Sequence, residues 1–244
     1  MKYFFDTEFL EGKQDKTLFG LKYGETKPTI DLISIGIVAE DGREYYAISK
    51  DFNIDEAWNR HCNSDWITDN VLRPIYEELL YSGHLQAGID FPGISPDEFT
   101  LKNLKKLIKA YGKTNNQIAE EIKIFAYNPK SVRPTVSEAS IEFYAYYADY
   151  DWVVFCQLFG TMMDLPVFFP MYCKDLKQIL DKKASTLTDF ESFNSGHHTN
   201  MSFYRGLKEM KLLESYPKQE NEHNALADAR WNVELYKFLN SQKQ

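Results

Sequence analysis

The sequence predicts one α/β domain with a helical insertion, on three observations. Short runs rich in aromatic and β-branched residues are typical of buried strands. These runs are separated by segments in which apolar residues recur at helical spacing. The 244 residues are 43% hydrophobic and 15% aromatic, which is enough to fill a core. We therefore expect a single domain over residues 1–244, with the insertion at about residues 52–133.

Three strands are expected near the start of the chain. Residues 1–7 carry an aromatic run, and residues 31–39 are rich in isoleucine and valine. Asp41-Gly42 is a hairpin turn signal, so residues 43–49 are expected to return as a third strand. Residues 12–29, with glycines and mixed charge, are expected to form an exposed loop.

Helical patterns dominate the insertion. Residues 64–81 predict a helix that is interrupted at Pro74. Ser95 and Glu98 form a capping-box pattern with Pro96 at the first helical position, so a helix is expected from there to about residue 111. Thr114 and Gln117 form a second capping-box pattern, for a helix over residues 114–125.

The second half predicts one more strand and several helices. Residues 141–148 are aromatic and strand-like, and the acids Asp149 and Asp151 follow at the end of this strand. Helices are expected over residues 152–159, 171–182, 202–213 and 224–239. The polar stretch 186–199, which contains His197 and His198, is expected to be a loop.

Charge and cysteine content restrict the class of protein. Lys and Arg number 28 against 36 Asp and Glu, and the net charge of −8 argues against a general nucleic-acid coating protein. Carboxylate-held metal ions would still let such a protein bind a polyanion locally. Cys62, Cys156 and Cys173 form no C-x-x-C pair and are expected to be packing residues. We see no signal peptide and no membrane span, and therefore expect a cytoplasmic protein.

Two acids at the end of the first expected strand indicate a metal site. A strand places Asp6 and Glu8 on one face, roughly 6.6 Å apart. Two carboxylates on one face repel each other and resist burial. A divalent cation relieves this repulsion, and oxygen ligands favour Mg²⁺ or Mn²⁺. The alternative is a pair of acids at a solvated strand end.

The C-terminal segment EHNALADARWN adds a histidine and a further acid. His223 precedes the last expected helix, and Asp228 lies in its first turns, so both can face one cleft. A lone histidine at a helix start is often a cap or a surface residue. Several acids together with one histidine instead favour metal-assisted hydrolysis with a general base.

These motifs, in this order, resemble a known class of enzymes. Asp6-x-Glu8, the segment YADYD with Asp151, and His223-x4-Asp228 resemble the DEDDh class of 3′–5′ exonucleases, in the RNase T and proofreading-subunit superfamily. The segments YFFDTEF, AYYADYDWVVFCQLFG and HNALADARWN further resemble the RNase AS-like exoribonuclease family. The resemblance implies an RNase H-like fold, with a mixed central β-sheet flanked by helices.

The resemblance also implies roles for individual residues. His223 would be the general base, and two Mg²⁺ or Mn²⁺ ions would be held by Asp6, Glu8, Asp151 and Asp228. Asp149 competes with Asp151 for the third acid, and we prefer Asp151 because the family's acid is followed by an apolar helix. Thr7 and Phe9 would contact the 3′ nucleotide, with a core position for Phe9 as the alternative.

The implied activity is the metal-dependent release of nucleoside 5′-monophosphates from the 3′ ends or overhangs of single-stranded RNA. A homodimer is implied as well. Three alternatives stay open: DNA as the substrate, because no residue identifies a 2′-hydroxyl reader; a non-catalytic binding or scaffolding module on the same fold; and a hydrolase of free nucleotides.

Five lysines in the insertion share one face of an expected helix, with apolar residues on the other. They are Lys102, Lys105, Lys106, Lys109 and Lys113. This pattern is typical of an amphipathic surface helix, and it also fits a row of phosphate contacts that steers single strands.

Overall fold

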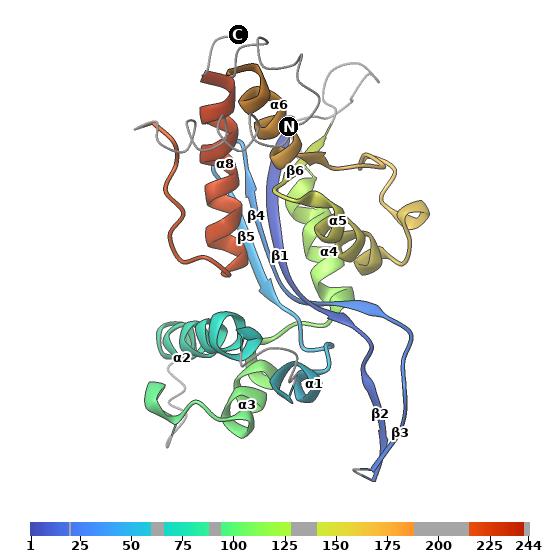
Figure 1. The fold of residues 1–244 in the computed structure, drawn as a ribbon. Helices are drawn as coiled ribbons and strands as arrows, with labels where there is room; N and C mark the ends of the chain where they lie inside the picture. Colours follow the sequence, from blue (N-terminus) through green and yellow to red (C-terminus); the bar gives the residue numbers. More distant parts are fainter. Residues whose placement is uncertain (20, 60–65, 88–93, 128–140, 188–214, 242–244) are drawn as a thin grey trace, which may run out of the picture.

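The computed structural model describes residues 1–241 apart from 20, 60–65, 88–93, 128–140 and 188–214. It is a mixed α/β structure, which confirms the expected α/β class (Figure 1). A five-stranded sheet has the order β5-β4-β1-β6-β7. The strands are β1 Lys2–Gly12, β4 Thr29–Ala39, β5 Glu44–Ile48, β6 Glu142–Ala145 and β7 Lys174–Asp175. The β1, β4 and β5 strands are antiparallel neighbours, whereas β6 and β7 run parallel to β1.

Strand β1 extends well past the two acids, so the expectation that Asp6 and Glu8 stand at a strand's end is wrong. Pairing with β4 continues to the Gly12–Thr29 pair and keeps the backbone extended, with a bulge between Glu8 and Phe9. On the other edge, β6 pairs with β1 only as far as Phe4. The β1 backbone beyond Phe4 therefore has an edge that no described strand covers, and the acids stand beside it.

The expected loop at residues 12–29 contains a two-stranded ribbon instead. Strands β2 (Asp15–Leu18) and β3 (Leu21–Glu25) pair antiparallel and project from the body (Figure 1). The segment is exposed, as expected, and the ends of the ribbon are joined by a hydrogen bond from the Thr26 N–H to the Gln14 carbonyl, 2.8 Å. Because neither face is buried, these strands lack the alternation of apolar and polar residues that would have predicted them.

The helices between β5 and β6 divide between two cores. They are α1 Ile54–Asn59, the π-helical turn η1 Thr68–Leu72, α2 Arg73–Ala87, the 3₁₀ turn η2 Pro96–Glu98, α3 Leu101–Tyr111 and α4 Asn115–Ala126. The first five elements surround a core that includes Leu72, Tyr76 and Leu104. Helix α4 instead packs on the central sheet through Ile118 and Ile122.

One predicted cap is confirmed and one is wrong. Thr114 and Gln117 form the expected capping box at the start of α4. Ser95 makes no capping hydrogen bond, and only one 3₁₀ turn follows it. Helix α3 begins at Leu101, where the Thr100 hydroxyl accepts a hydrogen bond from the Asn103 N–H at 3.3 Å. The interruption expected at Pro74 is the π-helical turn that ends just before α2.

Helix α5 (Ala148–Phe159) begins four residues earlier than expected, and β6 ends three residues earlier. Tyr147 makes the turn between them with φ of 57°, in the left-handed region. Asp149 and Asp151 therefore lie in the first turns of a helix rather than at a strand's end. This correction decides which acid faces inward, because residues two apart on a helix point in different directions.

Among the residues that the structure describes, the remaining helices are the 3₁₀ turn η3 (Met162–Asp164), α6 (Leu176–Leu187) and α8 (Ala225–Ser241). Helix α6 is displaced from the expected 171–182 by the short β7, and α8 is close to the expected 224–239. The helix expected at 202–213, His197, His198 and Cys62 lie outside the described residues. Among the described helices, none combines the length and apolar character that a membrane crossing requires.

Helices cover both faces of the sheet (Figure 1). Phe4 packs on one face with α6 and with Trp231 and Leu235 of α8. Tyr3 and Phe5 pack on the opposite face with α4 and α5. Alternate residues of β1 therefore enter different cores, and Asp6 follows Phe4 on the face that α8 covers.

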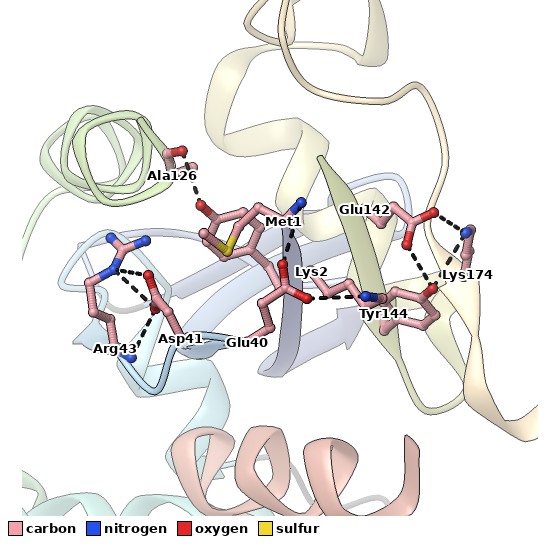
Figure 2. A network of polar contacts seen from close by, with 10 residues as sticks. Met1, Lys2, Glu40, Asp41, Arg43, Ala126, Glu142, Tyr144 and Lys174 are labelled. Atoms are coloured by element: carbon pink, nitrogen blue, oxygen red, sulfur yellow. Dashed lines mark hydrogen bonds and ion pairs between the residues drawn. The ribbon is translucent and has the colours of Figure 1, made fainter. Parts of the chain in front are cut away.

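Polar contacts fasten the starting end of β1 (Figure 2). The Lys2 ammonium pairs with Glu40 at 3.0 Å, and the Tyr3 hydroxyl donates to the Ala126 carbonyl of α4 at 3.0 Å. On the neighbouring strand, the Tyr144 hydroxyl donates to Glu142 at 2.9 Å, and Lys174 pairs with the same carboxylate. The first two contacts join the start of β1 to Glu40 and to α4, and the Lys174 contact joins β7 to β6.

Gly36 allows the start of α8 to approach the sheet. It lies opposite Asp6 in the β1–β4 register, and a Cβ at this position would stand 2.3 Å from the Ala225 carbonyl oxygen. Such a contact is far below the van der Waals distance, so a side chain here would displace the helix. The absence of a Cβ at Gly36 therefore sets the distance between α8 and the acids of β1.

We predict that Gly36→Ala lowers the free energy of unfolding by about 1–3 kcal/mol, because a displaced helix loses packing against β1 and β4. Urea denaturation followed by circular dichroism measures the change. Gly24→Ala is the matched control, because a Cβ at Gly24 meets no atom within 4 Å. Equal stability of the two variants would contradict the role of Gly36.

Candidate active site

One pocket of about 240 Å³ brings together the seven residues to which the sequence motifs assign a role. The pocket is lined by Asp6, Thr7, Glu8, Phe9, Asp151, His223 and Asp228, together with Tyr147 and Tyr150. The lining comes from β1, the start of α5 and the start of α8. Three segments far apart in the chain thus meet beside the uncovered edge of β1.

Three carboxylates lie closest together. One oxygen from each of Asp6, Glu8 and Asp228 lies within 4.8 Å of the others. The first turn of α8 is held by Asn224, whose side-chain oxygen accepts hydrogen bonds from the backbone N–H groups of Leu226 and Ala227 at 3.1 and 3.0 Å. This cap and the close approach at Gly36 place Asp228 against the acids of β1.

Asp151 reaches β1 from the helix that covers the other face. Its Oδ1 atom accepts hydrogen bonds from the Thr7 backbone N–H at 2.9 Å and from the Thr7 hydroxyl at 2.5 Å. Parallel pairing with β6 has ended before Thr7, and the carboxylate takes the place of a strand partner. Asp149 is exposed and does not line the pocket. The geometry thus brings Asp151, and not its competitor, to the other acids.

His223 occupies a tight turn before α8. Its φ of 68° lies in the left-handed region, and its backbone N–H donates to Asp228 Oδ2 at 2.9 Å. The Gln219 amide donates to Asp228 Oδ1 at 2.6 Å. The imidazole lies edge-on to the Trp66 ring at 4.6 Å between centroids. The segment between β5 and β6 therefore supplies one contact to the histidine, and the backbone turn orients Asp228.

Aromatic rings form one wall of the pocket. Phe9 is half-buried and stacks on Tyr150 with a centroid distance of 5.7 Å and an interplanar angle of 9°. Tyr147 is exposed on the same wall. The two tyrosines were not singled out from the sequence, although both lie in the YADYD segment. Their role in the wall depends on α5 starting at Ala148, because a strand ending there would have pointed them elsewhere.

Burial raises the pKa of every acid in the pocket, and for Asp6 and Glu8 repulsion by the other pocket acids raises it further. Burial is the largest cause for Asp6, and the nearby Asp151, Glu8 and Asp228 raise its pKa further. Burial, with Asp228 and Asp151, raises the pKa of Glu8 to about 8.

The other two acids combine burial with hydrogen bonds that act in the opposite direction. Burial raises the pKa of Asp151 to about 7, although the hydrogen bonds from Thr7 act to lower it. Burial also raises the pKa of Asp228, against the hydrogen bonds from Gln219 and His223. All four acids thus lie where the protein disfavours negative charge, and a bound cation would reverse this preference.

Comparisons with known proteins bear on this pocket. Residues 101–239 match the family described as the 3'-5' exoribonuclease Rv2179c-like domain, a stretch that contains Asp151, His223 and Asp228. One curated relative is the 3'-5' exoribonuclease Rv2179c of Mycobacterium tuberculosis strain ATCC 25618 / H37Rv. Another is the 3'-5' exoribonuclease MT2234.1 of Mycobacterium tuberculosis strain CDC 1551 / Oshkosh. Each is 27% identical over 241 residues, which covers 99% of this chain and 94% of the relative.

We predict that Glu8→Gln stabilises the metal-free protein at pH 8. The pKa of Glu8 is raised in the folded state, so the folded state binds the proton more tightly than the unfolded state. Stability is therefore lost as the pH rises from about 4.5 through about 8, and the neutral glutamine avoids this loss. Urea denaturation with a chelator present should show a gain of about 1–3 kcal/mol at pH 8 that disappears near pH 4.

Glu11→Gln is the control for this experiment, because Glu11 is an exposed carboxylate on the same strand. A Glu8→Gln variant whose advantage over the wild type did not change between the two pH values would contradict the electrostatic account.

Proposed function

The chain belongs to the 3'-5' exoribonuclease Rv2179c-like family, and on this premise we propose that its pocket removes nucleotides from RNA 3′ ends with the help of two divalent ions. The observation that carries the proposal is the convergence of four acids and one histidine in a single pocket. We further propose that the family lies within the DEDDh class and that residues 1–244 form one RNase H-like domain. The mixed sheet flanked by helices supports that fold.

The donor set fits Mg²⁺ or Mn²⁺. The side chains that converge are carboxylates, which suit hard divalent cations better than Zn²⁺ or copper. Asp6, Glu8 and Asp228 would provide the closest oxygens, and Asp151 would complete the set from the side of α5. The pKa values of Asp6 and Glu8 are raised because burial and the neighbouring acids disfavour negative charge there, and bound ions would reverse this preference.

The residues of the chain would divide the work of hydrolysis. When bound, the ions would supply an activated water and stabilise the charge on the departing 3′ oxygen. The His223 imidazole, which lines the pocket, would take the proton from the attacking water. Thr7 holds one oxygen of Asp151 through two hydrogen bonds, which orients this carboxylate. Gln219 and the His223 backbone do the same for Asp228.

The aromatic wall would position the terminal nucleotide. Phe9 and Tyr150 stack beside the acids, and a base that packs on such a surface gains roughly 1–3 kcal/mol. Thr7 lies in β1, two residues before Phe9, and would contact the nucleotide through its backbone. These two roles of Thr7 are compatible, because its hydroxyl and N–H face Asp151 and its carbonyl oxygen remains for the substrate.

Asp151→Asn should reduce the release of nucleoside 5′-monophosphate from RNA by at least roughly 100-fold, because the ions lose a charged ligand. The measurement is the turnover of a 3′-labelled RNA with Mg²⁺, alongside titration calorimetry of Mn²⁺ binding. Asp149→Asn is the matched control, since this exposed acid lies two residues away and outside the pocket. If Asp149→Asn were the damaging variant, the assignment of the third acid would be wrong.

The wild type should degrade RNA faster than DNA of the same sequence when both are supplied as single strands with Mg²⁺. This expectation rests on the family, whose relatives are named as exoribonucleases. Equal or faster decay of the DNA would assign the chain to the deoxyribonuclease alternative. Decay of neither strand, with intact metal binding, would favour a binding module. Rapid hydrolysis of free nucleotides with neither strand degraded would favour a nucleotide hydrolase.

The homodimer expected from the resemblance stays a prediction. Light scattering coupled to size exclusion should give a mass near twice the 28.5 kDa of one chain. A mass of one chain across the micromolar range would exclude a stable dimer.

A further inference from the structure

Three hollows are linked by shared or neighbouring lining residues, starting from the catalytic pocket. The middle hollow, of about 230 Å³, is lined by Leu32 and Val154 among others. Leu32 is the β4 partner of Phe9, and Val154 lies one helical turn after Tyr150, so both adjoin the aromatic wall of the catalytic pocket. The third hollow shares Phe52 with the middle one. The shared and neighbouring lining residues therefore connect the catalytic pocket, through the middle hollow, to the hollow beside α1 and α3.

The third hollow, here called the lysine pocket, is lined, in the described part of the chain, only by lysines and apolar residues. Its volume is about 170 Å³, and its lining consists of Lys50, Phe52, Ile54, Lys105, Ile108 and Lys109. Phe52 and Ile108 are 6% and 5% exposed and form an apolar floor. Every polar residue in the lining is a lysine. A pocket with an apolar floor and a cationic rim matches a ligand that has both a flat apolar surface and a negative charge.

Most of the positive charge at this pocket is not neutralised locally. Lys105 pairs with Asp55 at 2.5 Å. Lys50 and Lys109 are exposed and form no ion pair with any residue that the structure describes. Helix α3 carries four lysines and no acid, in a chain whose net charge is −8. This local excess of cations gives a polyanion a reason to bind here rather than elsewhere on the surface.

We infer that the lysine pocket binds a nucleotide of the RNA strand upstream of the cleaved 3′ end. The base or ribose would pack on Phe52 and Ile108, and the phosphate would face Lys50 and Lys109. This inference rests on the proposed function and adds a second binding site to it. An extended single strand whose last nucleotide occupies the catalytic pocket would pass the middle hollow and reach the lysines with an earlier nucleotide.

The middle hollow would serve as a passage rather than an anchor. It contains two acids, Asp31 and Asp51, which would repel a phosphate. Both already accept hydrogen bonds, Asp51 from the Asn115 backbone N–H at 2.7 Å and Asp31 from the Gln14 amide. Phosphate binding is therefore expected at the two ends of the path, at the ions and at the lysines.

The test compares the double variant Lys50→Gln/Lys109→Gln with the wild type on RNA strands of two to twenty nucleotides. In the wild type, KM should drop once the strand is long enough to reach the lysine pocket. The double variant should lack this drop, and its KM for the twenty-nucleotide strand should be roughly tenfold above that of the wild type. The slope of log KM against the logarithm of the salt concentration should be smaller by about 1 in the double variant. Turnover of the dinucleotide should stay within twofold of the wild type, because the catalytic pocket is untouched.

The matched control is Lys102→Gln/Lys106→Gln, which removes the same charge from α3 but changes no residue of the lysine pocket. It should keep the dependence of KM on strand length. An equal rise of KM in both variants would show a diffuse charge effect and overturn the pocket, and so would an unchanged KM in both. Failure of the proposed function is seen separately, as a wild type that cleaves neither the dinucleotide nor the long strand.

Discussion

Four carboxylates share one half-buried pocket, and contacts elsewhere in the fold hold them close together despite their mutual repulsion. Asp6 and Glu8 come from a strand that enters the core on both sides of them, so they cannot move away without breaking β1. Asp228 is held by Gln219 and by a backbone N–H, and Asp151 is held by Thr7. The protein therefore holds these carboxylates where negative charge is disfavoured, and a bound cation would relieve this cost.

Two features of β1 make this arrangement possible. The early end of its pairing with β6 leaves a backbone N–H free for the Asp151 carboxylate, which substitutes for a missing strand. The glycine opposite Asp6 lets α8 lie close enough to add Asp228. A longer β6 would remove the first feature, and any side chain on Gly36 would remove the second. The site thus depends on an interrupted sheet as much as on the acids themselves.

Periodicity and capping patterns in the sequence predicted those elements whose formation depends on neighbouring residues in the chain. The strand runs, the Thr114–Gln117 cap and the last helix follow from periodicity and capping, and these were found correctly. The site residues were singled out because acids and a histidine recur in a recognisable order. The choice of Asp151 over Asp149 was made from the apolar residues that follow, and the helical start at Ala148 gives it a physical reason.

What the sequence did not predict depends on contacts between distant segments. The β2–β3 ribbon buries neither face, so it leaves no apolar alternation to detect. Trp66, Gln219 and Tyr150 gain their positions only when the segment between β5 and β6, the segment before α8 and the start of α5 converge. The path of three hollows is likewise a property of the assembled chain, since no single segment contains more than part of it.

The β2–β3 ribbon is expected to be less stable than the central sheet. Two strands with solvent on both faces gain little beyond their own hydrogen bonds, and an isolated pair of this kind is barely stable in water. Its amide protons should exchange with solvent at rates set by local opening, independently of the central sheet. Phe19, 97% exposed between β2 and β3, is thus carried on an arm that can bend or fray while the part of β1 that holds Asp6 and Glu8 stays fixed.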